Sequence, residues 1–354
     1  MKISLNITLK EKNFMKKLLC LVLSIIMVFS LTCLVGCSDK EDGATETADT
    51  LKFGLGINAK LENITSADGD TVGNAKASVT AAAVLLDKNG NIVKCTIDSM
   101  ENNMGFTSEG KFVEAGEYRT KYEQGNDYGM VAYAKAEKEW FEQIDALCAL
   151  VEGKKIDEVK ALVAADYKGT EDVISAGCTI YISDFVYAIE NAVKNAAESK
   201  STSDCTIKLG IVSTQTGAKD AAEEAEGANE VDTTVVATAV DKDGKIVAVS
   251  TDALAAKVTF DTKGVSATEA AAITTKKDAG TNYNMAAYGQ DLNGDGKVLE
   301  WFEQADAFNV ACIGKTKYDV ASLSNDKGYG SDDLQKAGCT IHIGDMVKAL
   351  SKAV

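Results

Sequence analysis

Two threonines end the same short phrase, which occurs twice in a chain of 354 residues. "AGCTIYISDF" begins at Ala176, and "AGCTIHIGDM" begins at Ala337, 161 residues later. Small residues before the start of a helix are typical of an anion site, because free amides at a helix N-terminus attract phosphate. The phrase is also typical of a tight turn into a strand, in which Thr179 and Thr340 bond the backbone. Both interpretations stay open, and the pattern alone favours the second.

The other reactive side chains give no sign of a catalytic centre. The cysteines after residue 37 form no CxxC pair, and His342 is the single histidine. Familiar zinc and haem sites are therefore not expected. The sequence contains no recognisable catalytic triad, pair of catalytic carboxylates or phosphate-binding glycine loop. We therefore do not expect an enzyme.

A cluster of oxygen ligands begins at residue 291. Asp291, Asn293 and Asp295 fit the first positions of an EF-hand calcium loop, with Gly296 at the sharp turn. The twelfth position should be acidic, but it is Phe302. The segment predicts either a calcium site or an Asn-Gly-Asp-Gly turn that bridges an insertion.

A long internal repeat decides how the chain is organised. "DKNGNIV" matches "DKDGKIV", "YGMVAY" matches "YNMAAY", and "EWFEQIDA" matches "EWFEQADA", in the same order in both halves. The repeat predicts two homologous domains, at residues 50–200 and 204–354. The polar segment "ESKSTSD" between them is expected to be a linker.

Each copy reads as strands first and helices afterwards. Runs rich in β-branched residues flank an Asn-Gly turn at residues 89–90 and an Asp-Gly turn at 243–244, which predicts a hairpin in each copy. Apolar residues in "KEWFEQIDALCALVEG" recur at helical spacing. The predicted fold class is α+β, with an antiparallel sheet and a few helices in each domain.

The N-terminal segment predicts export and a lipid anchor. Lys16 and Lys17 precede a long apolar run that ends in "LVGC", which is typical of a bacterial lipoprotein signal peptide over residues 1–36. Cys37 is the predicted lipidation site, and the polar residues 37–49 suit a flexible tether. The expected location is the extracellular face of the cell membrane. A net charge of −16 argues against a nucleic-acid partner, since phosphates would be repelled.

The order of these motifs resembles the FMN-binding domain family. A "DxxGxIV" hairpin is followed by "YxM", by "EWFEQ…GK" and by a small-residue phrase that ends in threonine before an amphipathic helix. This arrangement is similar to the tandem copies on Gram-positive lipoproteins of extracellular electron transfer, and the resemblance covers most of both copies. In that family a flavin transferase joins FMN through its phosphate to the threonine of an Asp-x-x-Ser-Gly-Ala-Thr motif.

The corresponding stretches of this chain are "DVISAGCT" and "DLQKAGCT". They differ from the motif in three ways: alanine replaces serine, cysteine replaces alanine, and the aspartate lies seven residues before the threonine instead of six. The resemblance implies the following cofactor-binding residues: Asp172, Gly177, Cys178, Thr179, Asp333, Gly338, Cys339 and Thr340.

A flavin ring would also need an apolar or aromatic wall. The expected ring contacts are the tyrosine and methionine of each "YxM" stretch, with the tryptophan of each "EWFEQ" as a further candidate. These residues are Tyr128, Met130, Trp140, Tyr283, Met285 and Trp301. The alternative for all of them is an ordinary place in the hydrophobic core.

The resemblance implies a membrane-anchored electron carrier with FMN attached to a threonine in each domain. It would relay electrons from a membrane quinone or NADH oxidoreductase to acceptors outside the cell, after loading by a flavin transferase. The main alternative is a surface lipoprotein whose FMN-binding-like domains hold no flavin and serve adhesion or partner binding. A solute-binding lipoprotein is a weaker alternative, because such proteins usually have two unlike lobes.

Overall fold

The computed structural model describes residues 50–287 and 298–354. The predicted signal peptide, Cys37 and the tether lie outside the described residues, as do the calcium ligands expected at Asp291, Asn293 and Asp295. The described residues belong to one compact unit, Ala48–Val354. We call residues 50–204 copy 1 and residues 205–354 copy 2.

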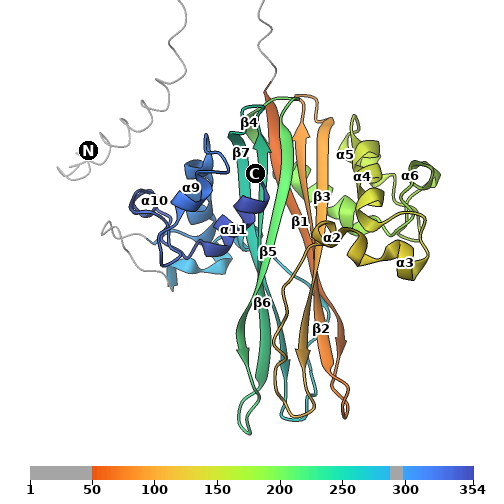
Figure 1. The fold of residues 1–354 in the computed structure, drawn as a ribbon, viewed down its shortest axis with the longest axis vertical. Helices are drawn as coiled ribbons and strands as arrows, with labels where there is room; N and C mark the ends of the chain where they lie inside the picture. Colours follow the sequence, from red (N-terminus) through yellow and green to blue (C-terminus); the bar gives the residue numbers. More distant parts are fainter. Residues whose placement is uncertain (1–49, 288–297) are drawn as a thin grey trace, which may run out of the picture. The chain divides into compact units, whose positions relative to one another are not determined.

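Each copy begins with three long antiparallel strands (Figure 1). They are β1 (Leu51–Thr65), β2 (Gly73–Leu86) and β3 (Ile92–Phe106) in copy 1, and β5 (Thr206–Lys219), β6 (Gly227–Val240) and β7 (Ile246–Phe260) in copy 2. Two short strands, β4 (Ala197–Ser201) and β8 (Ala271–Ala272), both pair with β1. One sheet therefore has the order β3-β2-β1-β4, and the other has the order β5-β6-β7.

The helices follow the strands in both copies. In copy 1 they are α2 (Lys121–Gln124), η1 (Gly125–Tyr128), α3 (Met130–Ala134), α4 (Trp140–Val151), α5 (Ile156–Lys160), α6 (Glu171–Ala176) and α7 (Ser183–Lys194). In copy 2 they are α8 (Lys276–Ala279), η2 (Gly280–Tyr283), η3 (Met285–Ala287), α9 (Trp301–Cys312), η4 (Val320–Leu323), α10 (Asp332–Lys336) and α11 (Gly344–Lys352). The antiparallel sheets with separate helices make the fold α+β, as predicted.

The predicted hairpins are confirmed, and their turns are built alike. The carboxylate of Asp87 accepts hydrogen bonds from the backbone N–H groups of Asn89 and Asn91, both at 2.8 Å. In copy 2 the Asp241 carboxylate accepts hydrogen bonds from the backbone N–H groups of Asp243 and Lys245, both at 2.9 Å. Gly90 has a φ of 81°, a left-handed conformation that glycine adopts without a steric penalty.

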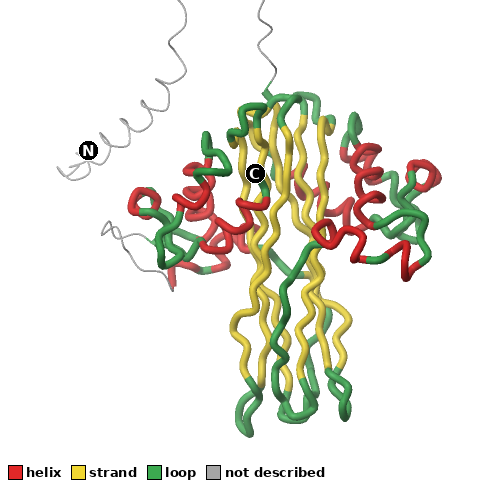
Figure 2. Tube along the Cα trace, viewed as in Figure 1, coloured by secondary structure: helices red, strands yellow, loops and turns green. Residues whose placement is uncertain are grey.

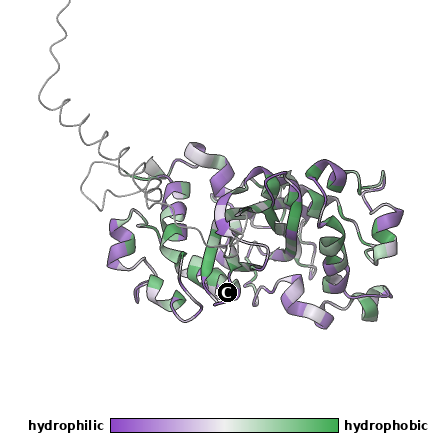
Figure 3. Cartoon of the chain, turned by 90° about the horizontal axis from the view of Figure 1, so that it is seen from above, coloured by the Kyte–Doolittle hydropathy of each residue, from purple (hydrophilic) through white to green (hydrophobic). Residues whose placement is uncertain are grey.

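The elements form four layers, with the two sheets in the middle and the helices of each copy outside (Figures 1 and 2). Seen from above, the hydrophobic colouring lies on the strands in the middle and on parts of the helices beside them (Figure 3). Strand β2 shows the reason: Ala82 and Val84 face the helices of copy 1, whereas Ala81, Ala83 and Leu85 face the sheet of copy 2. A sheet buried on both faces reads as a continuous apolar run, and "TAAAVLL" is such a run.

The core between the sheets is shared by both copies. One cluster joins Leu55 and Leu85 of copy 1 to Val235 and Leu254 of copy 2. In a second cluster Phe106 stacks on Phe260, with ring centroids 4.6 Å apart and planes inclined by 7°. Each copy therefore completes the hydrophobic core of the other.

The chain also crosses between the copies after the third strand of each sheet. The segment after β3 reaches copy 2, where the Ala115 N–H donates to Gln215 Oε1 at 2.9 Å. The segment after β7 reaches copy 1, where the Ile273 N–H donates to the Ala59 carbonyl at 2.8 Å. Figure 2 shows these crossing loops in green. The residues expected to form a free linker, 198–204, instead include most of β4, which pairs with β1.

Candidate functional site

The repeated threonine is held by the glutamine of the repeated "EWFEQ" in both copies. The Thr179 backbone N–H and hydroxyl both donate to Gln143 Oε1, at 2.9 and 3.1 Å. Thr340 makes the same two bonds to Gln304 Oε1, at 2.8 and 3.0 Å. Both glutamines are buried, whereas Thr179 is exposed and Thr340 is half-buried. In each copy, therefore, the repeated phrases "AGCT" and "EWFEQ" are in direct contact through the threonine and the glutamine.

The glycine and cysteine before each threonine shape the loop from inside. Gly177 and Gly338 have φ values of 103° and 107°, which favour glycine. Cys178 and Cys339 are fully buried in the cores between sheet and helices. Burial raises the pKa of the two thiols to about 11 and about 12. The structure thus places both predicted cysteines in the core, next to an exposed Thr179 and a half-buried Thr340.

The predicted aspartates lie at the far end of the preceding helix. Asp172 is exposed in the first turn of α6, and Asp333 is exposed in the first turn of α10. The threonines follow the other end of these helices. The structure therefore does not bring either aspartate to its threonine.

The "YxM" stretch and "EWFEQ" are also joined in both copies. The Glu139 carboxylate accepts hydrogen bonds from the backbone N–H groups of Met130 at 2.9 Å and Val131 at 3.2 Å. In copy 2 the Glu300 carboxylate accepts a bond from the Met285 N–H at 2.9 Å. The glutamate at the start of the long helix thus fixes the backbone of the predicted ring-contact methionine.

A lysine that our sequence analysis missed lies over the predicted aromatic residues. Lys121 Nζ is 4.8 Å from the ring centroid of Tyr128 and 5.7 Å from that of Trp140. In copy 2, Lys276 Nζ is 5.3 Å from the ring centroid of Tyr283 and 5.8 Å from that of Trp301. These distances are typical of cation–π contacts. The repeated "TK" at 120–121 and 275–276 was the sequence signal for this lysine.

A cavity of about 230 Å³ lies beside these residues in copy 1. One wall is mainly apolar and includes Tyr128, Met130, Trp140, Ile180 and Phe185. The other wall is polar and comes from the strands and from the first residue of α2: Glu62, Ser78, Thr80, Ser99, Glu101 and Lys121. Ile180 and Tyr181, the two residues after Thr179, also line it. The structure therefore brings together three predicted residues, Tyr128, Met130 and Trp140, and places the cavity next to the threonine.

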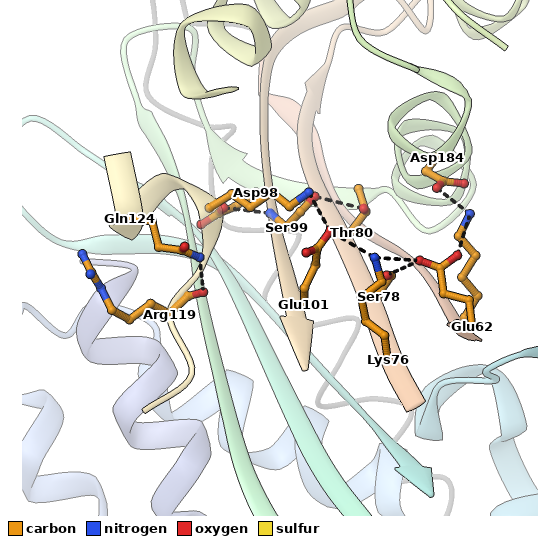
Figure 4. Close-up of polar contacts among 12 residues, drawn as sticks. Glu62, Lys76, Ser78, Thr80, Asp98, Ser99, Glu101, Arg119, Gln124 and Asp184 are labelled. Carbon is orange, nitrogen blue, oxygen red and sulfur yellow. Dashed lines mark hydrogen bonds and ion pairs between the residues drawn. The ribbon is translucent and has the colours of Figure 1, made fainter. Parts of the chain in front are cut away.

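The polar wall is an alternating chain of charges (Figure 4). Lys76 lies between two carboxylates, 3.3 Å from Glu62 and 3.4 Å from Glu101. Glu101 also pairs with Lys121 at 3.0 Å. Burial acts to raise the pKa of Glu101, but Lys121 and Lys76 outweigh it and hold that pKa below its usual value. Burial also acts to raise the pKa of Glu62, but Ser78 and Lys76 outweigh it, so both carboxylates of this wall have a pKa below the usual value.

The chain of charges continues to the helix that follows the threonine. Lys60 links Glu62, at 3.9 Å, to Asp184, at 2.7 Å, and Asp184 also accepts a hydrogen bond from Asn58 at 3.1 Å. Asp184 is the second residue of α7. The ion pairs therefore connect strand β1 to the start of the helix that closes the cavity.

A buried aspartate in each copy fixes the helix that carries the aromatic-facing lysine. Asp98 Oδ1 accepts hydrogen bonds from the Ser99 N–H at 2.7 Å and the Tyr122 N–H at 3.2 Å. Asp252 Oδ1 accepts hydrogen bonds from the Ala253 N–H at 2.7 Å and the Lys277 N–H at 3.0 Å. Burial raises the pKa of each carboxyl group to about 6. Each group is therefore protonated more readily in the folded protein than in the unfolded chain.

This shift predicts a specific dependence of stability on pH. A raised folded-state pKa contributes stability that is full below about pH 4 and is lost as the pH rises through about 6. Two pKa units correspond to roughly 3 kcal/mol. Between pH 4 and pH 7, Asp98→Asn should therefore gain about that much unfolding free energy relative to the unmodified protein. Denaturant unfolding at several pH values measures this difference.

Asp252→Asn should behave in the same way, and the exposed Asp157→Asn is the control. If the free energy of unfolding changed with pH in the same way in Asp98→Asn and in the unmodified protein, the raised pKa of Asp98 would be contradicted.

Comparisons with known proteins found no matching family model, no matching curated protein and no matching solved structure. Within residues 50–287 and 298–354, no group of three or more His, Cys, Asp or Glu side chains is placed to hold a metal ion. Across the same residues, no helix has the length and apolar character needed to span a membrane.

Proposed function

We propose that this protein is a membrane-anchored extracellular electron carrier that uses FMN, attached through its phosphate to a threonine of the "AGCT" phrase. The observation that carries the proposal is the position of Thr179. It is exposed, and the next two residues line a cavity whose apolar wall contains Tyr128 and Met130. A group attached to the Thr179 hydroxyl is thus within reach of this cavity.

The cavity fits a ring better than a whole nucleotide. Its volume of about 230 Å³ is below the usual range of ligand pockets, roughly 300–1,000 Å³. The aromatic and thioether side chains of one wall suit the faces of a planar ring. The hydroxyls of Ser78, Thr80 and Ser99 on the other wall suit its polar edge. The ribityl phosphate would then stay outside, toward Thr179.

The threonine is suited to receive the phosphate. Its hydroxyl hydrogen is donated to Gln143, so the lone pairs of the oxygen are free to face solvent. In the attachment step this oxygen attacks the phosphorus of a flavin donor that is activated as a phosphoanhydride. A phosphorus–oxygen bond forms, the anhydride bond breaks, a nucleotide leaves, and the hydroxyl proton is released to a base of the transferase. A flavin transferase must supply that base.

FMN, when bound, passes one or two electrons, and the protein orients it and tunes its potential. In the proposed role the partners are a membrane quinone or NADH oxidoreductase as electron donor and an acceptor outside the cell. The lipid anchor proposed at Cys37 would keep the carrier beside its donor. Lys121, which lines the cavity, would lie at the polar edge of the ring and favour added negative charge there.

Retention of flavin under denaturing conditions tests the proposal. Protein made together with the transferase should give a fluorescent band on a denaturing gel, because a phosphoester does not depend on the fold. Thr179→Ala combined with Thr340→Ala should abolish the fluorescence. Cys178→Ala combined with Cys339→Ala is the matched control and should keep it. Flavin that washes out of the unmodified protein would contradict covalent attachment.

One observation favours a second function. In both copies the threonine hydroxyl already donates to a buried glutamine, so the repeated phrase has a structural role without any flavin. This favours a surface lipoprotein that serves adhesion or partner binding. A protein that stays colourless after production with the transferase would support this function over the first.

A further inference from the structure

The two copies differ at the residues that surround the proposed flavin. The lysine before "EWFEQ" is the first difference. A Cβ atom built on Gly177 would lie 2.2 Å from Lys138 Nζ, so this ammonium lies directly over the loop that carries Thr179. Among the described residues, the Lys138 ammonium has no carboxylate partner, in contrast to the paired Lys76 and Lys121.

Copy 2 has no cation at this position. The equivalent residue is Leu299, whose Cδ1 would lie 2.6 Å from a Cβ atom on Gly338. A phosphodiester carries a negative charge, and a charge-assisted contact with an ammonium group stabilises it. Lys138 supplies that contact in copy 1, whereas Leu299 cannot supply it in copy 2.

The strand wall differs as well. Ser78 pairs with Glu101 across β2 and β3, and the equivalent pair in copy 2 is Asp232 with Ala255. Lys76, the cation at the centre of the wall in copy 1, is replaced by Glu230. Copy 2 has its two carboxylates, Glu230 and Asp232, at these positions, whereas Glu62 and Glu101 of copy 1 are replaced by Thr216 and Ala255. Each wall therefore has two carboxylates; in copy 1 Lys76 lies within 3.4 Å of both, whereas Glu230 of copy 2 pairs with Lys257 at 3.7 Å.

The threonines also differ in access. Thr179 is exposed, whereas Thr340 is half-buried. In copy 2 the amide oxygen of Gln304 accepts a third hydrogen bond, from the Ile341 N–H at 3.2 Å. The loop of copy 2 is thus held more tightly at the position that a transferase must reach.

We infer that copy 1 alone carries the flavin, with Lys138 beside the phosphate on Thr179, and that copy 2 is the structural partner that completes the shared core. This inference rests on the proposed function. It predicts one FMN per chain, although the "AGCT" phrase occurs twice.

Intact mass of the mature full chain, made together with the flavin transferase, tests the inference. The unmodified protein should carry one FMN increment. Thr179→Ala should lose it, and the matched variant Thr340→Ala should keep it. Two increments, or one increment that disappears only in Thr340→Ala, would overturn the inference and leave the proposed function standing. No increment in any sample would overturn both.

Lys138→Leu separates the role of the cation from that of the hydroxyl. Leucine occupies the equivalent position in copy 2, so the fold should tolerate it. The rate of flavin loading, followed by intact mass, should fall about tenfold, which is the usual effect of one lost charged hydrogen bond. Lys194→Leu, in the last turn of α7, is the control and should load normally. An unchanged rate in Lys138→Leu would remove Lys138 from the site.

Discussion

Neither copy is expected to fold as a monomer when the chain is divided between residues 204 and 205. Division exposes the inner faces of both sheets, which contain the cluster around Leu85 and Leu254 and the stacked rings of Phe106 and Phe260. Soluble monomers rarely expose continuous apolar patches of more than a few hundred Å². Copy 1 alone should therefore aggregate or self-associate through its inner sheet face.

Size-exclusion chromatography with light scattering, together with thermal melts, measures this outcome. Co-expression of the two halves is the matched control, because it restores both sheets and the crossing segments and should give a 1:1 complex. A monomeric copy 1 that melts cooperatively near the temperature of the full chain would contradict the shared core.

Adding one methyl group to Gly56 or Gly210 is expected to have the second large effect. A Cβ atom on Gly56 would lie 2.1 Å from the backbone nitrogen of Ala192, and one on Gly210 would lie 1.9 Å from the carbonyl oxygen of Ala349. Both neighbours are helix backbone, so the packed helix must move away from the sheet. We expect a loss of about 3 kcal/mol, or a melting temperature lower by about 5 °C.

Gly116→Ala is the control for these two variants, because a Cβ atom there has no neighbour within 4 Å. Calorimetry or circular dichroism of the three variants provides the comparison. Equal melting temperatures for all three would show that α7 and α11 do not pack as closely as described.

Much of the local structure could be predicted from the sequence. The Asn-Gly and Asp-Gly turns identified the hairpins, since their geometry depends on residues within five positions. Helical periodicity identified α4. The shared core could not be predicted in the same way, because a buried run such as "TAAAVLL" shows that both sheet faces are covered but not by what. The polar segment at 198–204 was expected to be a linker, yet it supplies most of β4, because β1 offers it an edge to pair with.

At the candidate site, too, the sequence indicated individual residues but not the contacts between residues far apart in the chain. The sequence identified the two threonines, and the structure adds their partners Gln143 and Gln304, each 36 residues earlier in the chain. Both members of this contact lie in repeated phrases, but no sequence rule pairs a threonine with a glutamine at that distance. Lys121 was missed because an isolated lysine is usually a solvent-exposed residue. Only the fold brings it over Tyr128 and Trp140.

The intact mass of the protein purified from the membranes of its native host tests the proposed function most directly. It requires no choice of transferase or expression host, and it reports the lipid and the flavin in one measurement. We predict the mass of the processed, lipidated chain plus one FMN joined as a phosphoester, with the flavin on the peptide that contains Thr179. A mass that the lipidated chain accounts for completely, with no flavin on either threonine, would contradict the electron-carrier function.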